Sequence, residues 1–192
     1  MKVFEKIVFA LSFSLLLFTS TALFAQKDPP LSRIVGGKST TITEVPWQVA
    51  LAFNREEGSF YDNQFCGGTI IDEYWIVTAA HCVEFGIDNT TPNVSDLVVV
   101  AGITDLDNAP DGNPQIQVRE VTQIIIHPDY PGQAVSFDSD IALLRLATPL
   151  QLDGVTARAI PYATADDAAA GLIDTGTVAT ISGWGNTSSQ GS

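Results

Sequence analysis

Apolar residues fall in six short runs between positions 47 and 146, and Gly, Pro, Asn and Asp separate the runs. The runs are rich in β-branched and aromatic residues, and none has the length and period of an amphipathic helix. Such runs, bounded by turn-forming residues, are typical of β-strands. The predicted strands cover residues 47–53, 65–71, 75–80, 97–103, 115–127 and 141–146. They predict an all-β domain, either a small barrel or a sandwich.

The alternation of polar and apolar residues over 115–121 predicts a strand with one buried and one solvated face. After Leu150 the pattern changes, because residues 151–173 are rich in alanine and aspartate and lack strand periodicity. This stretch is interpreted as an exposed connector. Residues 175–185 return to strand character, and seven more residues complete the sequence. We expect residues 175–185 to be the first strand of a second, truncated domain.

Residues 1–25 have the pattern of a secretory signal peptide. Two lysines give a positive start, residues 7–17 are apolar apart from small serines, and Ala22 or Ala25 offers a cleavage site. The alternative is a membrane anchor, because the apolar stretch approaches spanning length. The short charged flank and the small residues at its end favour cleavage. We therefore expect a secreted protein with no membrane contact after signal removal.

The composition narrows the class of protein further. With 192 residues, 45% hydrophobic and 16% charged, the chain has enough material for a globular core. Its formal net charge of -13 argues against a nucleic-acid partner, because an acidic surface repels phosphates. The chain has two cysteines, Cys66 and Cys82, and an oxidising destination would allow them to pair.

The stretch Trp75-Ile76-Val77-Thr78-Ala79-Ala80-His81-Cys82 places a histidine at the end of a predicted strand. Cys82 follows directly, and Cys66 is its only possible partner, so a bridge would anchor the backbone of the histidine. A lone histidine beside a disulfide is ordinarily a core residue. Other stretches favour a chemical role for His81.

Asp140 leads directly into the apolar strand predicted at 141–146. Burying a carboxylate there is costly unless it is paired, and a histidine partner would satisfy it as in Ser/His/Asp catalysis. The alternative is an ordinary turn residue. Arg33 ends the polar linker at 26–33, and a cut after it would free an α-ammonium on Ile34. The alternative there is a strand that begins after a loop.

Seven short stretches in order resemble the trypsin-like (chymotrypsin-fold) serine endopeptidases, from Arg33 to nearly the end of the chain. They are Arg33-Ile34-Val35-Gly36-Gly37, Pro46-Trp47-Gln48-Val49, Phe65-Cys66-Gly67-Gly68-Thr69-Ile70-Ile71, Thr78-Ala79-Ala80-His81-Cys82, Ile126-His127-Pro128, Asp140-Ile141-Ala142-Leu143-Leu144 and Gly183-Trp184-Gly185-Asn186-Thr187. The resemblance implies a double antiparallel β-barrel. Residues 26–33 would be an activation propeptide and 34–150 a complete N-terminal barrel, while 151–192 would hold the connector and about one strand of a truncated C-terminal barrel.

The same resemblance implies roles for individual residues. His81 would be the general base and acid, and Asp140 the carboxylate that orients it. Cys66 and Cys82 would form the bridge beside the histidine, and cleavage between Arg33 and Ile34 would be zymogen activation. His127 matches a family position without a catalytic role. The implied partners are a protein or peptide substrate and an activating protease, and the complete protein would be a monomer without a cofactor.

The sequence departs from the family at the nucleophile. The family's serine lies in a Gly-Asp-Ser-Gly-Gly-Pro stretch, and Ser182, Ser188, Ser189 and Ser192 lack that context. We therefore expect a secreted serine endopeptidase by family, of which this chain alone is an inactive fragment. One alternative is a non-catalytic homologue that binds a partner through its barrel, but the presence of both His81 and Asp140 argues against it. Another is an unrelated structural β-domain, which the Arg33–Ile34 junction does not favour.

The loop at 105–113 carries aspartate and asparagine oxygens of the kind that calcium prefers. Some members of the family bind calcium in the corresponding loop. Ile103 and Pro114, however, stand near the positions where those members have glutamates. The sequence therefore favours a solvated acidic turn, and no metal site is expected.

Overall fold

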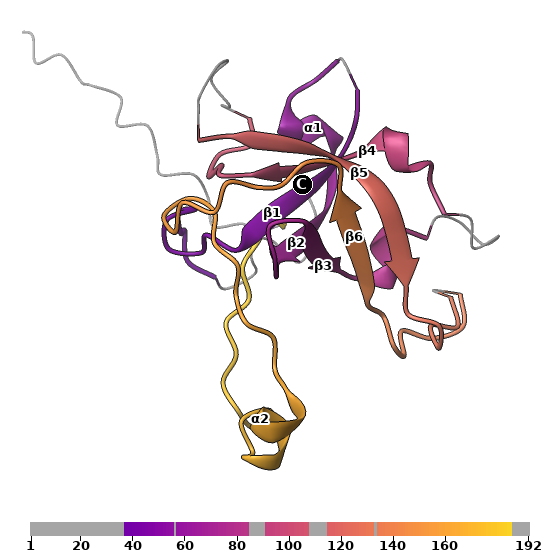
Figure 1. Cartoon of the computed structure of the whole chain (residues 1–192), viewed down its shortest axis with the longest axis vertical. Helices are drawn as coiled ribbons and strands as arrows, with labels where there is room; N and C mark the ends of the chain where they lie inside the picture. The colour runs from indigo at the N-terminus through magenta and orange to yellow at the C-terminus, as the bar shows by residue number, and fades with distance from the viewer. Residues whose placement is uncertain (1–36, 56, 85–90, 108–114, 133, 186–192) are drawn as a thin grey trace, which may run out of the picture.

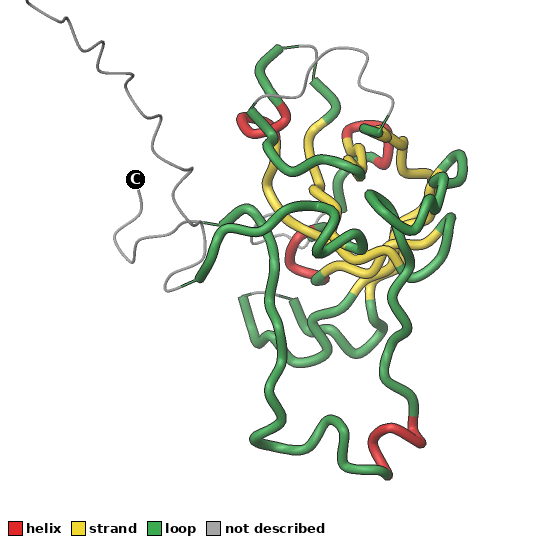
Figure 2. Tube along the Cα trace, turned by 90° about the vertical axis from the view of Figure 1, so that its left-hand side faces the viewer, coloured by secondary structure: helices red, strands yellow, loops and turns green. Residues whose placement is uncertain are grey.

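The six apolar runs form six strands, which close into a single antiparallel barrel in the order β1-β2-β3-β6-β5-β4 (Figure 1). The computed structural model describes residues 37–55, 57–84, 91–107, 115–132 and 134–185. The strands are β1 (Gln48–Phe53), β2 (Gln64–Ile70), β3 (Trp75–Thr78), β4 (Leu97–Ala101), β5 (Gln117–Ile126) and β6 (Ala142–Leu146). The predicted all-β fold is confirmed. Figure 2 shows the strands gathered in one body, with the helical turns outside them.

Strands β1 and β4 are apolar at nearly every position because both of their faces are covered. Alternate side chains such as Val49, Leu51 and Val99 point into the barrel and belong to its main core. The intervening side chains, which include Ala50 and Val100, form a second cluster outside the barrel, against Phe60, Ile116 and Trp184. The continuous apolar runs at 47–53 and 97–103 thus follow from two separate layers of packing.

The alternation predicted around residue 117 is present, but a polar residue occupies the inner face there. Gln117 is buried, whereas Val118 is 42% exposed. The side-chain amide of Gln117 is satisfied, because its Nε2 donates to the carbonyl of Gln151 and its Oε1 accepts from the Gln151 amide. These two hydrogen bonds tie the chain that follows β6 to the barrel. Farther along β5, an irregularity in the β5–β6 pairing between Val121 and Gln123 shifts the register.

The structure also contains short helices that the apolar pattern did not predict. These are α1 (Phe60–Asn63), α2 (Ala165–Ala169) and two 3₁₀ turns at Ala80–Cys82 and Val94–Asp96. Capping boxes begin both α-helices: Ser59 pairs with Asp62, and Thr164 pairs with Asp167. Elements of four or five residues are too short to show helical periodicity, so these capping pairs were their only sequence signal.

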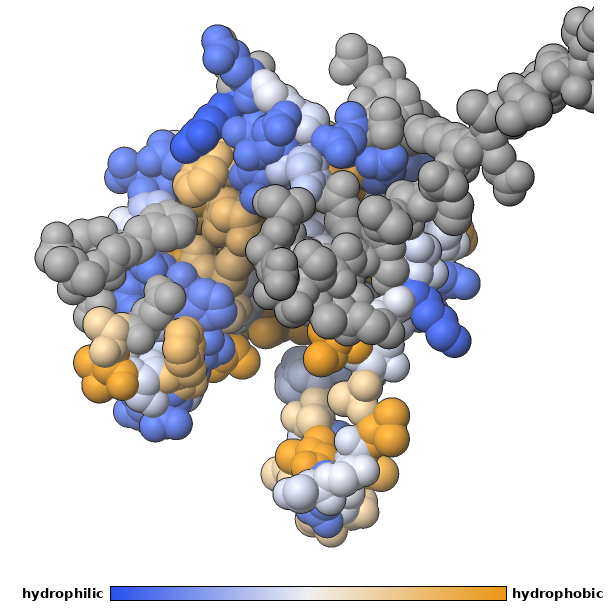
Figure 3. All heavy atoms as spheres, turned by 180° about the vertical axis from the view of Figure 1, so that it is seen from behind, coloured by the Kyte–Doolittle hydropathy of each residue, from blue (hydrophilic) through white to orange (hydrophobic). Residues whose placement is uncertain are grey.

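After β6 the chain first runs along the barrel, where the Arg158 and Ile160 amides donate to the Pro46 and Ile70 carbonyls. Beyond Ile160 it leaves the barrel as an arm that carries α2 near its tip and then returns (Figure 1). The arm exposes several large apolar side chains, visible as orange surface at the bottom of Figure 3. They include Leu172, Ile173, Val178 and Ile181. Within the described part of the chain, no helix has the length and apolar character needed to cross a membrane.

The strand expected over 175–185 is not formed, and this is a correction to the sequence prediction. A strand needs an adjacent edge, and the closed barrel leaves none free for a seventh strand. Side chains hold the returning segment instead. Ser182 Oγ donates to the buried Gln48 Oε1 at 2.7 Å, and Trp184 Nε1 donates to the carbonyl of Thr104 at 2.8 Å.

The carboxylate of Asp153 organises the turn at the base of the arm. Its Oδ1 accepts the backbone amides of Val155, Thr156 and Ala157 at 2.8–2.9 Å, and its Oδ2 accepts the Thr156 hydroxyl at 2.7 Å. The amide of Ala157 and the hydroxyl of Thr156 are the leading causes that hold the pKa of Asp153 far below its usual value. Thr156 and Ala157 are buried, so this carboxylate fixes where the chain leaves the core.

We expect Asp153→Asn to destabilise the fold by about 1 kcal/mol at pH 7, as for loss of a capping carboxylate. A folded-state pKa below the unfolded value stabilises the fold above the unfolded pKa of about 3.9, and this stabilisation is lost as pH falls through the folded pKa. The gap in unfolding free energy between parent and variant should therefore shrink below about pH 4. Urea unfolding at a series of pH values measures it, and a constant gap would contradict the assignment.

Candidate active site

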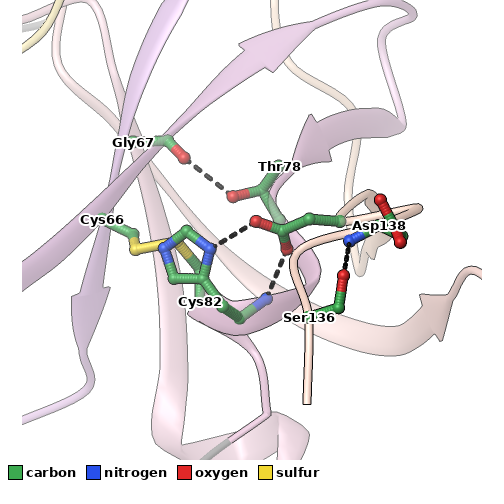
Figure 4. Close-up of polar contacts among 8 residues, drawn as sticks. Cys66, Gly67, Thr78, Cys82, Ser136 and Asp138 are labelled. Carbon is green, nitrogen blue, oxygen red and sulfur yellow. Dashed lines mark hydrogen bonds and ion pairs between the residues drawn. A yellow bond between two sulfur atoms is a disulfide. The ribbon is translucent and has the colours of Figure 1, made fainter. Parts of the chain in front are cut away.

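His81 is held in place by the elements on both sides of it. Strand β3 ends at Thr78, and the 3₁₀ turn Ala80–Cys82 follows at once, closed by hydrogen bonds from the Cys82 and Val83 amides to the Ala79 and Ala80 carbonyls. Cys82 forms a disulfide with Cys66 of β2 (Figure 4). A neighbouring hydrogen bond, from Thr78 Oγ1 to the Gly67 carbonyl at 2.8 Å, joins β3 to β2 again. The histidine backbone is thus fixed to two strands.

Asp140 reaches the same place from the opposite end of the neighbouring strand. Strands β3 and β6 pair with Thr78 opposite Ala142, so the residues just after β3 and just before β6 lie together. Ser139 has a φ of 56°, the left-handed region that a non-glycine residue rarely adopts. This turn before β6 introduces Asp140 beside the histidine.

The carboxylate of Asp140 makes two hydrogen bonds to His81. Its Oδ1 accepts the backbone amide at 2.8 Å, and its Oδ2 lies 2.7 Å from the ring Nδ1. The aspartate side chain is 17% exposed and the histidine side chain 38%, so the carboxylate is shielded while the imidazole reaches the surface. The structure brings together the two residues that the sequence singled out from positions 59 apart.

The electrostatics of the pair favour an ionised Asp140. Burial alone would raise the pKa of its carboxyl, but the hydrogen bonds from the His81 ring and from the His81 and Ala80 amides outweigh burial. The pKa of Asp140 therefore lies below its usual value. An ionised carboxylate accepts a hydrogen bond from a protonated Nδ1, and the proton on Nδ1 leaves Nε2 with a free lone pair. That tautomer is the one a general base needs.

Other side chains border the pair. The ring of Phe137 meets the His81 ring edge-on, with centroids 5.7 Å apart. Tyr130 packs in the main core, and burial first, then the negative charges of Asp140 and Glu84, raise the pKa of its hydroxyl. The sequence analysis did not identify Phe137, Tyr130 or Glu84 as neighbours of the pair. Phe137 had no signal in its exposed loop, while Tyr130 follows His127-Pro128-Asp129 in a turn that could have pointed to it.

The other predicted residues are placed as follows. Arg33, Ile34, Ser188, Ser189 and Ser192 lie outside the described residues, as does most of the loop at 105–113. Asp105 and Asp107 are described; Asp105 accepts the Asp107 amide, and Asp107 accepts the Ser59 hydroxyl. His127 accepts the Asp129 amide in a turn. Ser182 bonds to Gln48 rather than to His81.

A cavity of about 350 Å³ lies elsewhere, between the returning segment and the barrel. Its lining includes Thr41, Ile42, Gln48, Ile103 and Trp184. Neither His81 nor Asp140 lines it, so it is separate from the candidate active site.

The chain resembles known proteins over most of its length. The family model described as Trypsin matches residues 34–192. Coagulation factor IX of Cavia porcellus is 36% identical over 159 residues, which are 83% of this chain and 48% of that protein. Trypsin zeta of Drosophila melanogaster is 37% identical over 169 residues, which are 86% and 53%. Clotting factor C of Tachypleus tridentatus is 33% identical over 162 residues, which are 83% and 15%. The chain thus spans about half, or less, of the length of these relatives.

Proposed function

The chain belongs to the trypsin family of serine proteases, and we propose that it supplies the histidine and the aspartate of a secreted serine endopeptidase. The observation that carries the proposal is the double hydrogen bond of Asp140 to the backbone amide and the ring Nδ1 of His81. A structural histidine needs no carboxylate that holds both its backbone amide and its ring nitrogen on a partly exposed imidazole.

In the proposed mechanism His81 works through Nε2. A serine hydroxyl attacks the carbonyl of the peptide bond while Nε2 takes its proton, and the imidazolium returns that proton to the departing amine. Water then hydrolyses the acyl-enzyme in the same way. Asp140 keeps Nδ1 protonated and stabilises the imidazolium, so it needs to stay ionised throughout, as its lowered pKa favours.

The 192 residues lack the sequence context of the family's nucleophilic serine. They contain no Gly-Asp-Ser-Gly stretch, so we propose that this chain by itself does not hydrolyse peptides. A fluorophosphonate probe, which labels activated serines covalently, should leave the purified chain unlabelled. The product of the gene read past codon 192 should be labelled once, at a serine within such a stretch. Labelling of the 192-residue chain would refute the proposed inactivity.

The second candidate is a non-catalytic homologue that binds a partner through its barrel. The lack of a Gly-Asp-Ser-Gly stretch within the 192 residues is the observation that favours it. The same gene reading separates the two candidates. A stop codon directly after Ser192 would support the binding module, and an open frame that reaches a nucleophilic serine would exclude it.

We also propose that residues 1–25 direct export, that residues 26–33 form an activation peptide, and that an activating protease cuts after Arg33. The support is the basic end of the linker, the Ile-Val-Gly-Gly stretch that follows it, and the disulfide, which suits an oxidising compartment. Relatives named as coagulation and clotting factors agree with an extracellular location.

Treatment of the secreted precursor with trypsin is expected to produce a new N-terminus that reads Ile-Val-Gly-Gly. Arg33→Gln should block this cut, because trypsin requires a basic residue before the scissile bond. Lys27→Gln removes the other basic residue of the linker and should leave the cut after Arg33 unchanged. N-terminal sequencing distinguishes the outcomes, and cleavage elsewhere in both variants would argue against an activation site.

A further inference from the structure

Three side chains with metal-binding atoms converge beside the Asp140 carboxylate. The sulfurs of Cys66 and Cys82 and a ring nitrogen of His81 all lie within 4.8 Å of one another. In the described structure the sulfurs are joined, and a disulfide sulfur is not a thiolate ligand. We propose that reduction of the Cys66–Cys82 disulfide creates a zinc site made of two thiolates and the His81 imidazole.

The distances suit tetrahedral zinc. His81 Nε2 lies 3.6 Å from Cys82 Sγ. With Zn–S bonds of about 2.3 Å and Zn–N bonds of about 2.1 Å, a tetrahedral ion separates its nitrogen and sulfur ligands by about 3.6 Å. Two thiolates on the same ion stand about 3.8 Å apart, so the sulfurs separate when their bond breaks. The Cα atoms of the two cysteines are 6.0 Å apart, which leaves both side chains within reach of one ion.

Asp140 prepares the histidine for this role. Its Oδ2 lies 2.7 Å from Nδ1, which keeps the proton on that nitrogen and leaves the Nε2 lone pair on the side of the sulfurs. A histidine that binds zinc commonly donates its other ring N–H to a carboxylate, which fixes the ring and strengthens the ligand. The three ligands come from β2 and from the 3₁₀ turn Ala80–Cys82, which the barrel already holds together. The fourth position would take water.

The site forms in two steps, reduction of the disulfide and then binding of zinc. A phosphine reductant attacks one sulfur and breaks the S–S bond, and it leaves as the phosphine oxide with an oxygen from water. The two sulfurs gain two electrons and two protons and become thiols. Zinc then binds them as thiolates and releases both protons. The zinc-bound state occupies Nε2, the atom that would accept the proton in peptide hydrolysis, although the site itself does not depend on the proposed function.

The test begins with the metal-free 192-residue chain, reduced with a water-soluble phosphine and titrated with Co²⁺. Thiolate ligation should give a near-ultraviolet charge-transfer band that saturates at one equivalent and disappears when Zn²⁺ displaces the cobalt. The oxidised chain should show no such band. His81→Ala should lower zinc affinity by at least about 100-fold, because it removes a ligand. The matched variant His127→Ala, which changes the other histidine of the chain, should bind like the parent.

Asp140→Asn separates a folded site from adventitious binding by a loosened chain. The substitution should weaken zinc binding by about 10- to 100-fold if the carboxylate orients His81. In an unfolded chain the same substitution would leave the zinc affinity unchanged. Equal affinity in Asp140→Asn and the parent, or equal loss in His81→Ala and His127→Ala, would overturn the proposal. If reduction unfolds the chain, recovery of its β-sheet circular dichroism on addition of Zn²⁺ supports the site, and no recovery overturns it.

Discussion

Asp140→Asn in the proposed serine endopeptidase is expected to lower kcat by about 10⁴-fold at neutral pH, the size of loss known for this change in a Ser/His/Asp triad. The asparagine oxygen can still accept the His81 backbone amide, which now bonds Oδ1 at 2.8 Å. The amide nitrogen, however, would replace Oδ2 and donate toward Nδ1, at the position 2.7 Å away. His81 would then carry its proton on Nε2 and lose the lone pair that accepts the serine proton.

Asp138→Asn is the matched control, because it makes the same change two residues away on an exposed side chain of the same loop. It should leave kcat within about threefold of the parent, since surface changes have small effects. Steady-state kinetics on a peptide amide measures both variants. A loss of less than about tenfold for Asp140→Asn would contradict the proposed triad.

A second readout needs no nucleophile. In the 192-residue chain, ¹⁵N chemical shifts of the two histidine rings report which nitrogen carries the proton. Asp140→Asn should change the tautomer of His81 and leave that of His127 as it was. If this shift occurs while the complete protein proves inactive, the geometry of the pair stands and the proposed catalytic function fails.

Gly102→Ala is expected to destabilise the barrel by roughly 3–5 kcal/mol, because it combines backbone strain with a steric clash. Gly102 follows β4 with a φ of +78°, and a Cβ there would lie 1.9 Å from the carbonyl oxygen of Gln115. The obstacle is backbone, so no side-chain rotation relieves it. Since Ala101 pairs with Gln117, relief of the clash would distort the β4–β5 pairing.

Gly154→Ala is the control for strain without a clash. Gly154 has a φ of +75°, and a Cβ there would meet no atom within 4 Å. Gly154→Ala should lower the free energy of unfolding by only about 1–2 kcal/mol, because alanine is strained in the left-handed conformation. Urea unfolding of the two variants separates the contributions. If both variants lost the same free energy of unfolding, the backbone near Gln115 would have moved away from the added Cβ at little cost. That result would contradict a tight β4–β5 connection.

The sequence predicted the barrel strands well because each one packs its own apolar side chains. The runs around β1 and β4 are unambiguous, since both faces of these strands are buried. The disulfide followed from there being two cysteines. His81 and Asp140 were candidates because each stands at the end of a predicted strand, and the resemblance to the family implied that they act as a pair. Periodicity alone gave no measure of their distance.

Features that depend on distant partners could not be read from the sequence. Residues 175–185 have strand composition but no free edge to join, so their conformation depends on Gln48 and Thr104 far upstream. Gln117 faces inward because Gln151 satisfies its amide, which a pattern of polar and apolar letters cannot indicate. Phe137 lies beside His81 only because the turn before β6 places it there.

Because the His81 backbone amide donates a hydrogen bond to Asp140, the exchange rate of this amide proton reports how often the two residues separate. That amide can exchange with deuterium only when the carboxylate moves away, and the carboxylate is held by the pairing of β3 with β6. Its protection factor should therefore approach that of the barrel strands instead of that of surface turns. The residues proposed for proton transfer would then separate about as rarely as the barrel itself opens.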